Sequence, residues 1–183
     1  LARAIIHAVS GSEQSVSLPA HMESEGVAPT LLEATEQIPN IVNWLADRIR
    51  EIERFVDQFP STAIFVNSEA EVAPIAEALN AVLEEHNIRV VACSQGQVMG
   101  HDNDVRVFDI QHIKGLEFEA VFFIAVDRLA SLQPEIFDKY LYVGTTRAAT
   151  YLGITCDDEL PKSIKSLRPK FVPNWENPVS ITS

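Results

Sequence analysis

The sequence predicts an α/β fold: a doubly wound, mainly parallel sheet with helices on both faces. Short apolar runs rich in β-branched and aromatic residues alternate with longer segments of helical periodicity, which is typical of repeated strand–helix units. One run, residues 120–126, is apolar at every position, as in a central strand that is buried on both faces. With 183 residues, 46% of them apolar, the chain can form one well-packed domain.

The first half of the chain predicts two helices around one strand. Residues 1–35 mix Ser, Gly and Pro with short apolar pieces, which predicts an irregular N-terminal segment. From Ile38 the apolar residues recur at helical spacing opposite a charged face, so we expect a helix that ends before Pro60. Residues 62–66 are typical of a strand, and residues 69–85 predict the second helix.

The second half of the chain contains the remaining strands. Residues 135–149 predict a helix. Residues 161–183 carry four prolines and predict an irregular C-terminal tail, so that the domain itself spans residues 1–160. Apolar runs predict four further strands, at residues 89–93, 105–110, 120–126 and 151–155.

The charge balance limits which functions the chain can perform alone. It carries 14 Lys and Arg against 26 Asp and Glu, a net charge of −12, which argues against a free-standing nucleic-acid binder. One domain of a larger nucleic-acid machine stays compatible with this charge, because it needs only a small contact strip. No lysine follows a glycine, so the chain has no phosphate-binding P-loop and cannot hydrolyse ATP by itself in that way.

Membrane insertion and disulfide formation are not expected. No apolar run approaches the roughly 20 residues that cross a bilayer. The first residues lack the basic and apolar regions of a secretory signal, so we expect a cytoplasmic location. Cys93 and Cys156 have no CxxC partner and predict two reduced thiols beside a core.

Three polar clusters are candidates for chemistry. Lys114, Gly115 and Glu117 bring a cation, a flexible glycine and a carboxylate into four residues, a set that can contact a phosphate and a sugar hydroxyl. The alternative is a turn closed by a Lys–Glu pair. Arg147 stands among small residues, which suits an arginine finger as well as an ordinary surface arginine. The acidic residues 157–159 are better explained as a solvated turn than as magnesium ligands.

Two of these clusters together resemble a known family. Residues 114–122 (KGLEFEAVF), followed by residues 141–148 (LYVGTTRA), resemble motifs V and VI of UvrD/Rep/PcrA-type superfamily 1 DNA helicases. The resemblance extends in outline from about residue 60 onward. It implies that residues 1–160 form the second RecA-like motor domain of an ATP-dependent helicase. ATP and Mg²⁺ would then be held mainly by an absent first motor domain, which carries the P-loop.

The resemblance also implies roles for individual residues. Arg147 would be the arginine finger that stabilises charge on the transferring γ-phosphoryl group. Four residues would bind or shape the nucleotide site: Lys114, Gly115, Glu117 and Thr146. Two residues would face DNA: Gln111 and His112. The implied partners are single-stranded DNA or a duplex junction and the N-terminal RecA-like domain of the same protein, with no membrane involved.

The sequence departs from the family pattern at two places. Asn67 occupies the position where motif IV usually has an arginine. In motif V, Asp109 and Gln111 take the usual Thr and His places, which displaces His112 by one residue. Strand alternation would then turn His112 away from the face that Gln111 uses.

Two alternatives to a working motor domain remain open. Asn67 and the altered motif V are compatible with a degenerate motor domain that acts as a scaffold or interaction module. A small regulatory α/β domain would instead use Asp109, Asp157 or Asp158 in a metal or phosphoacceptor cluster. We take the helicase motor domain, inactive when isolated, as the leading hypothesis.

Overall fold

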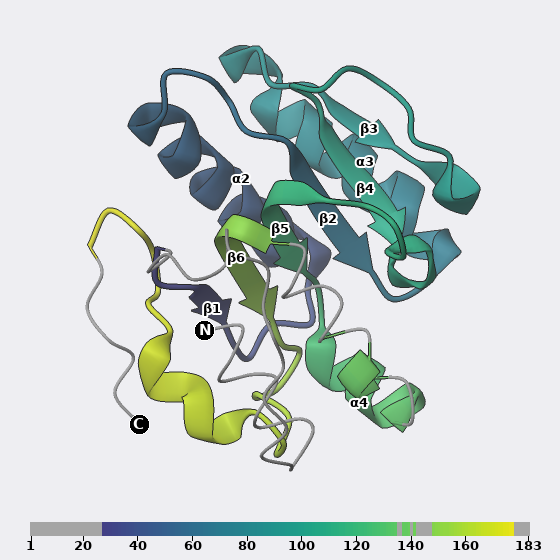
Figure 1. The fold of residues 1–183 in the computed structure, drawn as a ribbon, viewed down its shortest axis with the longest axis vertical. Helices are drawn as coiled ribbons and strands as arrows, with labels where there is room; N and C mark the ends of the chain where they lie inside the picture. Colours follow the sequence, from purple (N-terminus) through teal and green to yellow (C-terminus); the bar gives the residue numbers. More distant parts are fainter. Residues whose placement is uncertain (1–26, 135–136, 140, 142–147, 178–183) are drawn as a thin grey trace.

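The structure, a computed structural model, describes residues 27–134, 137–139, 141 and 148–177. Within these residues six strands form one sheet in the order β1-β6-β5-β2-β4-β3, and each neighbouring pair is parallel (Figure 1). The predicted α/β class is therefore confirmed. The strands are β1 (Thr30–Leu32), β2 (Thr62–Val66), β3 (Val90–Ala92), β4 (Val105–Asp109), β5 (Phe118–Phe123) and β6 (Ala148–Thr155).

Helices cover both faces of the sheet. Their bounds are α2 (Ile38–Phe55), α3 (Glu69–Leu83), α4 (Val126–Leu132) and the 3-10 helices η2 (Glu84–His86), η3 (Ser94–Gly96), η4 (Ile110–His112) and η5 (Lys165–Lys170). α2 and α3 pack against a core that includes Ile64 and Phe122, whereas α4 packs against a core that includes Phe65 and Phe123. Successive strand residues point to opposite faces, so Ile64 and Phe65 contribute to different cores.

The centre of the sheet is β2, whose residues are all buried. It pairs with β4 on one side and with β5 on the other. On the face that carries α4, Phe65 stacks between Phe108 and Phe123, with ring centroids 5.8 and 5.6 Å away. Each phenylalanine buried in this way contributes about 1.5–3 kcal/mol to folding. The strand predicted at residues 62–66 is β2, in the middle of the core. The one predicted at residues 120–126 is β5, beside it, but its bounds differ: β5 spans Phe118–Phe123, and α4 begins at Val126.

Two of the predicted boundaries are wrong. β1 lies inside the segment 1–35 that the composition predicts to be irregular. Its three residues are too few to show periodicity, and it forms because Thr30 pairs in register with the distant Gly153 of β6. β6 begins at Ala148, so the helix predicted over residues 135–149 does not reach its expected end.

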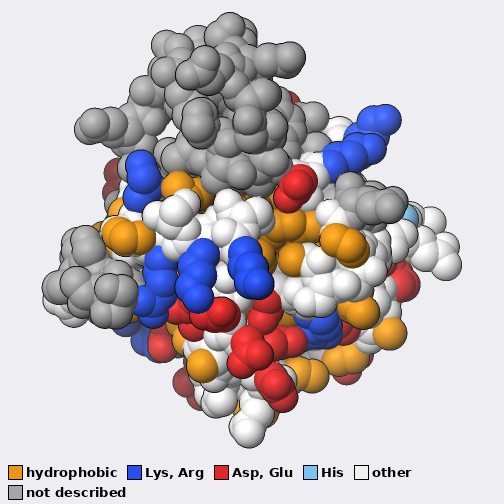
Figure 2. Space-filling view, turned by 90° about the horizontal axis from the view of Figure 1, so that it is seen from below, with side chains coloured by type: hydrophobic (Ala, Val, Ile, Leu, Met, Phe, Trp, Pro, Cys, Tyr) orange, Lys and Arg blue, Asp and Glu red, His pale blue; other side chains and the backbone are white. Residues whose placement is uncertain are grey.

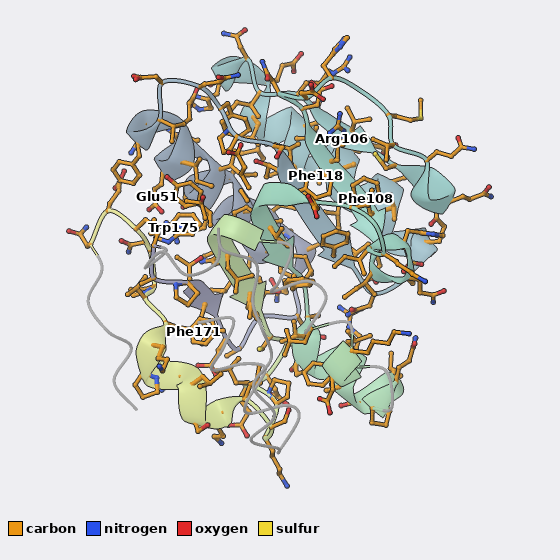
Figure 3. All side chains as sticks on the ribbon, in the orientation of Figure 1. Glu51, Arg106, Phe108, Phe118, Phe171 and Trp175 are labelled. Atoms are coloured by element: carbon orange, nitrogen blue, oxygen red, sulfur yellow. The ribbon has the colours of Figure 1, made fainter. Side chains whose placement is uncertain are left out.

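The segment after residue 160 belongs to the domain instead of forming a tail outside it. Its backbone is irregular apart from η5, but Phe171, Val172 and Trp175 are buried. The backbone N–H of Trp175 donates to Glu51, and its indole N–H donates to the carbonyl of Ala28 at 2.7 Å (Figure 3). Proline-rich composition therefore predicted the irregular backbone but not the burial, which depends on contacts with residues more than 100 positions earlier.

The two cysteines are free and buried, as the sequence predicts. Burial raises the pKa of both thiols, Cys93 and Cys156, so neither has the character of a reactive thiolate. Within the described ranges, none of the helices combines the length and the apolar character that a bilayer crossing requires.

Gly153 allows β6 to approach the α2 side of the core closely. A Cβ atom added there would collide with the ring of Phe122 and lie 3.0 Å from Cη2 of Trp44. We predict that Gly153→Val lowers the free energy of unfolding by about 1–3 kcal/mol, because both rings are held in a filled core. Urea denaturation measures this change. Thr150→Val, at an exposed position of the same strand, is the control and should change stability by less than about 0.5 kcal/mol. Equal stability of the two variants would contradict the packing described.

Candidate functional site

The connection between β4 and β5, residues 110–117, carries most of the residues selected by the family resemblance. Its apolar residues Ile110 and Ile113 are buried, whereas Lys114 and Glu117 are exposed. Two backbone hydrogen bonds of 3.2 Å, from Ile113 to Ile110 and from Leu116 to Ile113, tighten the turn. The loop is thus anchored by apolar side chains and presents its polar side chains to solvent.

Gly115 gives this loop its conformation. Its φ angle of +85° lies in the left-handed region, where residues with a Cβ are strained. Apart from its two chain neighbours, no heavy atom of the described residues lies within 4 Å of the place that a Cβ would occupy, so among these residues the space beside the glycine is open. A ligand could therefore approach the backbone here.

The loop ends where β5 begins, next to the start of β6. Phe118 pairs in register with Ala148, and its ring packs 5.9 Å from that of Phe108 (Figure 3). Glu117 directly precedes Phe118 in the sequence, as Arg147 directly precedes Ala148. Arg147 and Thr146 themselves lie outside the described residues. The strand pairing nevertheless brings Phe118 and Ala148, from the two segments that resemble motifs V and VI, together at the amino-terminal edge of the sheet.

Gln111 and His112 have different surroundings. Gln111 is exposed, and its backbone N–H donates to Oδ1 of Asp109 at 3.0 Å. His112 is half-buried and lies against Gly96 of η3. It forms one group of side chains with Glu69, at the start of α3, and Asp109. Gln111 is therefore exposed, as Lys114 is, whereas His112 lies beside two carboxylates.

Asn67 connects the carboxyl ends of three strands. Its side-chain amide donates to the carbonyl of Ala125 at 2.9 Å, and the N–H of Ala125 donates to Oγ1 of Thr155 at 2.9 Å. Ala125 is fully buried and has a φ angle of +51°, so the turn into α4 depends on these bonds. Asn67, which the resemblance places at the motif IV arginine position, thus has a structural role at this edge.

A second connection at the same edge involves Arg128. Its Nη1 lies 2.6 Å from Oε1 of Glu71 at the start of α3, and its Nε lies 3.1 Å from Oδ2 of Asp157 after β6. Burial alone would lower the pKa of Arg128, but hydrogen bonding and attraction from the two carboxylates raise it overall. Arg128 is therefore held as a cation between α3 and the end of β6.

The acidic residues after β6 form the turn that the sequence predicts. The carboxylate of Asp127 accepts the backbone N–H groups of Asp157 and Asp158 at 2.9 and 2.8 Å. Asp157 is paired with Arg128. Within the described residues, the one group of three side chains able to ligate a metal is Glu69, Asp109 and His112, so Asp157 and Asp158 form no metal cluster there.

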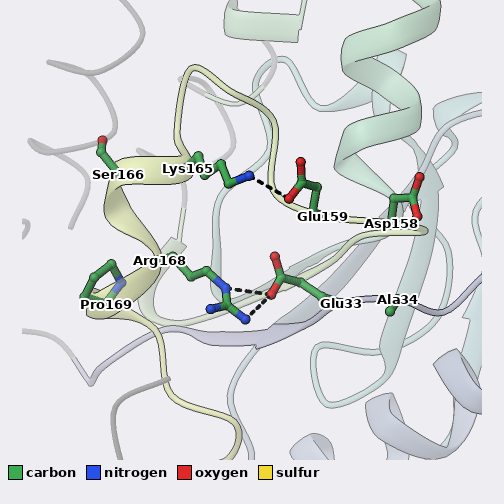
Figure 4. A pocket seen from close by; sticks show the side chains of 8 residues that line it. All are labelled: Glu33, Ala34, Asp158, Glu159, Lys165, Ser166, Arg168 and Pro169. Atoms are coloured by element: carbon green, nitrogen blue, oxygen red, sulfur yellow. Dashed lines mark hydrogen bonds and ion pairs between the residues drawn. The ribbon is translucent and has the colours of Figure 1, made fainter. Parts of the chain in front are cut away.

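A cavity of about 620 Å³ lies beside the carboxyl ends of β1 and β6, away from the β4–β5 loop (Figure 4). Four of its charged side chains form two pairs: Arg168 with Glu33 at 2.8 Å and Lys165 with Glu159 at 2.7 Å. The hydrogen bond from Lys165 holds the pKa of Glu159 below its usual value. Asp158 and Glu159, from the acidic cluster at residues 157–159, line this cavity, whereas none of the residues that the family resemblance selects does. Acidic and basic side chains lie next to one another across this face (Figure 2).

Comparison with known proteins finds a family match for the segment that contains β4, β5 and β6. Residues 104–155 match the UvrD-like helicase C-terminal domain. The matched segment runs from the residue before β4 to the end of β6, and the family resemblance of the sequence is confirmed there. No curated protein matches the chain.

A solved structure shares the fold over most of both chains. The C-terminal domain of a possible DNA helicase from Lactobacillus plantarum WCFS1 superposes with a TM-score of 0.58 at 20% identity, over 89% of this chain and 88% of the other. At this identity the similarity establishes the fold, which is the RecA-like α/β architecture expected from the sequence.

The sequence did not reveal the polar residues that connect the carboxyl ends of the strands. Asp127 and Arg128 directly follow the apolar run 120–126, so their position after a strand was the available signal. That signal carried no information about partners, because Glu71 and Asp157 come from distant parts of the chain.

The role of Asn67 can be tested by stability. Asn67→Ala removes the side-chain donor to the carbonyl of Ala125, and we predict a loss of about 0.5–1.5 kcal/mol in the free energy of unfolding. Denaturant titration measures it. Asn43→Ala, at an exposed position of α2, is the matched control and should leave stability within about 0.5 kcal/mol of the wild type. An unchanged midpoint for Asn67→Ala would mean that this hydrogen bond does not hold the three strand ends.

Proposed function

We propose that this chain is the C-terminal motor domain of an ATP-dependent DNA helicase and completes an ATP site whose P-loop lies on another domain. The observation that carries the proposal is the register of β5 and β6, in which Phe118 pairs with Ala148. It makes neighbours of two motifs that are well separated in the sequence. The match of residues 104–155 to the UvrD-like helicase C-terminal domain supports the same assignment.

The β4–β5 loop is suited to contact a nucleotide. Lys114 and Glu117 are exposed on it, and the open space beside Gly115 lets a phosphate or ribose approach the backbone. In the proposed mechanism Glu117 accepts a hydrogen bond from a ribose hydroxyl and Lys114 attracts phosphate oxygens. Bound Mg²⁺ would neutralise phosphate charge, and its ligands would come mainly from the P-loop domain.

Arg147 has the catalytic role in this proposal. A guanidinium donates through a planar fork of N–H groups, which matches the oxygens of a γ-phosphoryl group. Charge on that group develops in the transition state, so the arginine accelerates hydrolysis more than it strengthens binding. Thr146, its neighbour, is proposed to contact the same nucleotide.

DNA contact is proposed for the exposed part of the same loop. Gln111 is exposed and can donate or accept hydrogen bonds with a phosphate or a base. With a net charge of −12, the rest of the surface cannot attract DNA strongly. The domain would therefore bind DNA through a narrow strip and only together with its partner domain.

A non-catalytic scaffold is the second candidate. Asn67 favours it, because the side chain at the position of the family's motif IV arginine is engaged with the carbonyl of Ala125 and supplies no cation. The two candidates differ in whether the intact protein hydrolyses ATP.

The motor domain and the scaffold can be distinguished by measuring ATPase activity. The measurement uses the protein that combines this chain with its P-loop domain. For the motor domain we predict turnover that single-stranded DNA stimulates, and a loss of about 1,000-fold or more in kcat for Arg147→Ala. Nucleotide binding should be largely retained. Arg54→Ala, an exposed arginine of α2, is the matched control and should keep full turnover. Full turnover of Arg147→Ala would contradict the finger assignment, and an inactive wild type would favour the scaffold.

Glu117 should affect binding more than chemistry. For Glu117→Ala we predict a rise in the KM for ATP of about 10-fold with little change in kcat, as expected for a contact made equally in ground and transition states. Steady-state kinetics of the same protein measure both constants. Glu85→Ala, an exposed glutamate of η2, serves as the control. A normal KM would remove Glu117 from the nucleotide site.

A further inference from the structure

Three side chains that can ligate a metal meet at the carboxyl ends of β2 and β4. They are Glu69, Asp109 and His112, and one ligand atom from each lies within 4.8 Å of the other two. They come from three separate elements: the first residue of α3, the last residue of β4 and the last residue of η4. None of them is needed for the nucleotide contacts proposed above.

Strand register explains why the three side chains converge. Val66 and Asp109 are register partners, so β2 and β4 end side by side. α3 begins at Glu69, soon after the end of β2, and η4 begins directly after Asp109. The short turns leave little freedom for the chain, and the three residues are brought to one place by the sheet itself.

The carboxylate of Asp109 is buried without a cation. Asp109 is only 5% exposed, and Oδ1 accepts one hydrogen bond, from the N–H of Gln111. Among the described residues no lysine or arginine forms an ion pair with it, and its second oxygen, which has no hydrogen bond there, is not fully enclosed by the protein. A cation bound at this oxygen would supply the counter-charge that the carboxylate lacks.

The other two ligands are also available. Oε1 of Glu69 accepts the backbone N–H of Gln95 at 2.8 Å, which leaves the second oxygen open. The ring of His112 makes no hydrogen bond in the described part of the chain. Gly96 supports this ring: its φ angle is +72°, and a Cβ added to it would lie 2.7 Å from Nδ1 of His112. Only a glycine allows this contact, which positions the imidazole beside the carboxylates.

The donor set selects the kind of ion. Imidazole nitrogen suits Zn²⁺, Fe²⁺ and similar transition ions, whereas Mg²⁺ and Ca²⁺ prefer oxygen ligands alone. Ligand atoms around such an ion lie about 3–4 Å apart, so small side-chain rotations close the present group. We propose that Glu69, Asp109 and His112 bind a divalent transition-metal ion, with Zn²⁺ fitting this set best.

Binding would have a structural consequence for the β4–β5 loop. The ion would connect η4 to α3 and hold Gln111, which lies between Asp109 and His112 in the sequence, in a fixed position. It would also neutralise negative charge beside that exposed side chain. The site therefore acts as a clamp on the loop, and it does not depend on whether the chain belongs to a working motor.

Metal titration of the 183-residue chain tests the proposal. We expect calorimetry to show one saturable Zn²⁺ site per chain and Co²⁺ to give visible absorption bands at the same stoichiometry, with Mg²⁺ failing to compete at equal concentration. Asp109→Asn, His112→Ala and Glu69→Gln should each lower Zn²⁺ affinity by at least about 10-fold. His101→Ala and Asp102→Asn, at exposed positions outside the group, should leave it unchanged.

Two results would overturn the proposal. One is the absence of saturable binding by the wild-type chain whose circular dichroism shows the α/β fold. The other is Zn²⁺ binding that all three variants retain undiminished. Glu69→Gln is the most informative of the three, because Glu69 is exposed and its substitution does not endanger folding. The titrations contain neither ATP nor DNA, so they fail or succeed independently of the helicase assignment.

Discussion

The parallel pairing of β4, β2 and β5 is the constraint on which the rest of the structure depends. Thr62 at the start of β2 lies in register with Val105 and with Ala120, so all three strands run from one edge of the sheet to the other. The chain leaves β4 at the carboxyl edge and must return to the amino edge before β5 begins. Residues 110–117 must cross the length of a strand, roughly 17 Å, in this return. So few residues cannot both cross this distance and form a longer crossover helix. Burial of Ile110 and Ile113 anchors this short crossing.

The two edges of the sheet consequently differ in chemistry. At the carboxyl edge, hydrogen bonds and ion pairs within the domain engage Asn67, Asp127 and Arg128, and they connect α3, α4 and the end of β6. At the amino edge the β4–β5 loop presents exposed polar groups, next to the start of β6. The exposed polar groups proposed to contact a nucleotide thus lie toward the amino edge, although the carboxyl ends of strands are the usual place to search in an open α/β sheet.

Ion pairs within the domain help to explain why the two edges of the sheet differ in this acidic chain. Several arginines are paired with carboxylates inside the domain: Arg48 with Glu51, Arg128 with Glu71 and Asp157, and Arg168 with Glu33. The pairs of Arg128 and Arg168 connect separate segments of the chain, whereas that of Arg48 lies within α2. Together they leave less positive charge for a nucleic-acid surface. Asp109 is the exception among the buried acids, because no cation among the described residues neutralises it.

The sequence by itself determined the fold class, the strands at the centre of the sheet and the resemblance of residues 104–155 to the UvrD-like helicase C-terminal domain. The core strands are apolar over several consecutive residues, and the motifs in residues 114–122 and 141–148 are local patterns that can be read without a structure. Only the tertiary structure decided that β1 exists, that Trp175 is buried, that Asn67 holds Ala125 and that Glu69 meets Asp109 and His112. Each of these depends on partners distant along the chain, and periodicity and composition report on neighbours in sequence, not on neighbours in space.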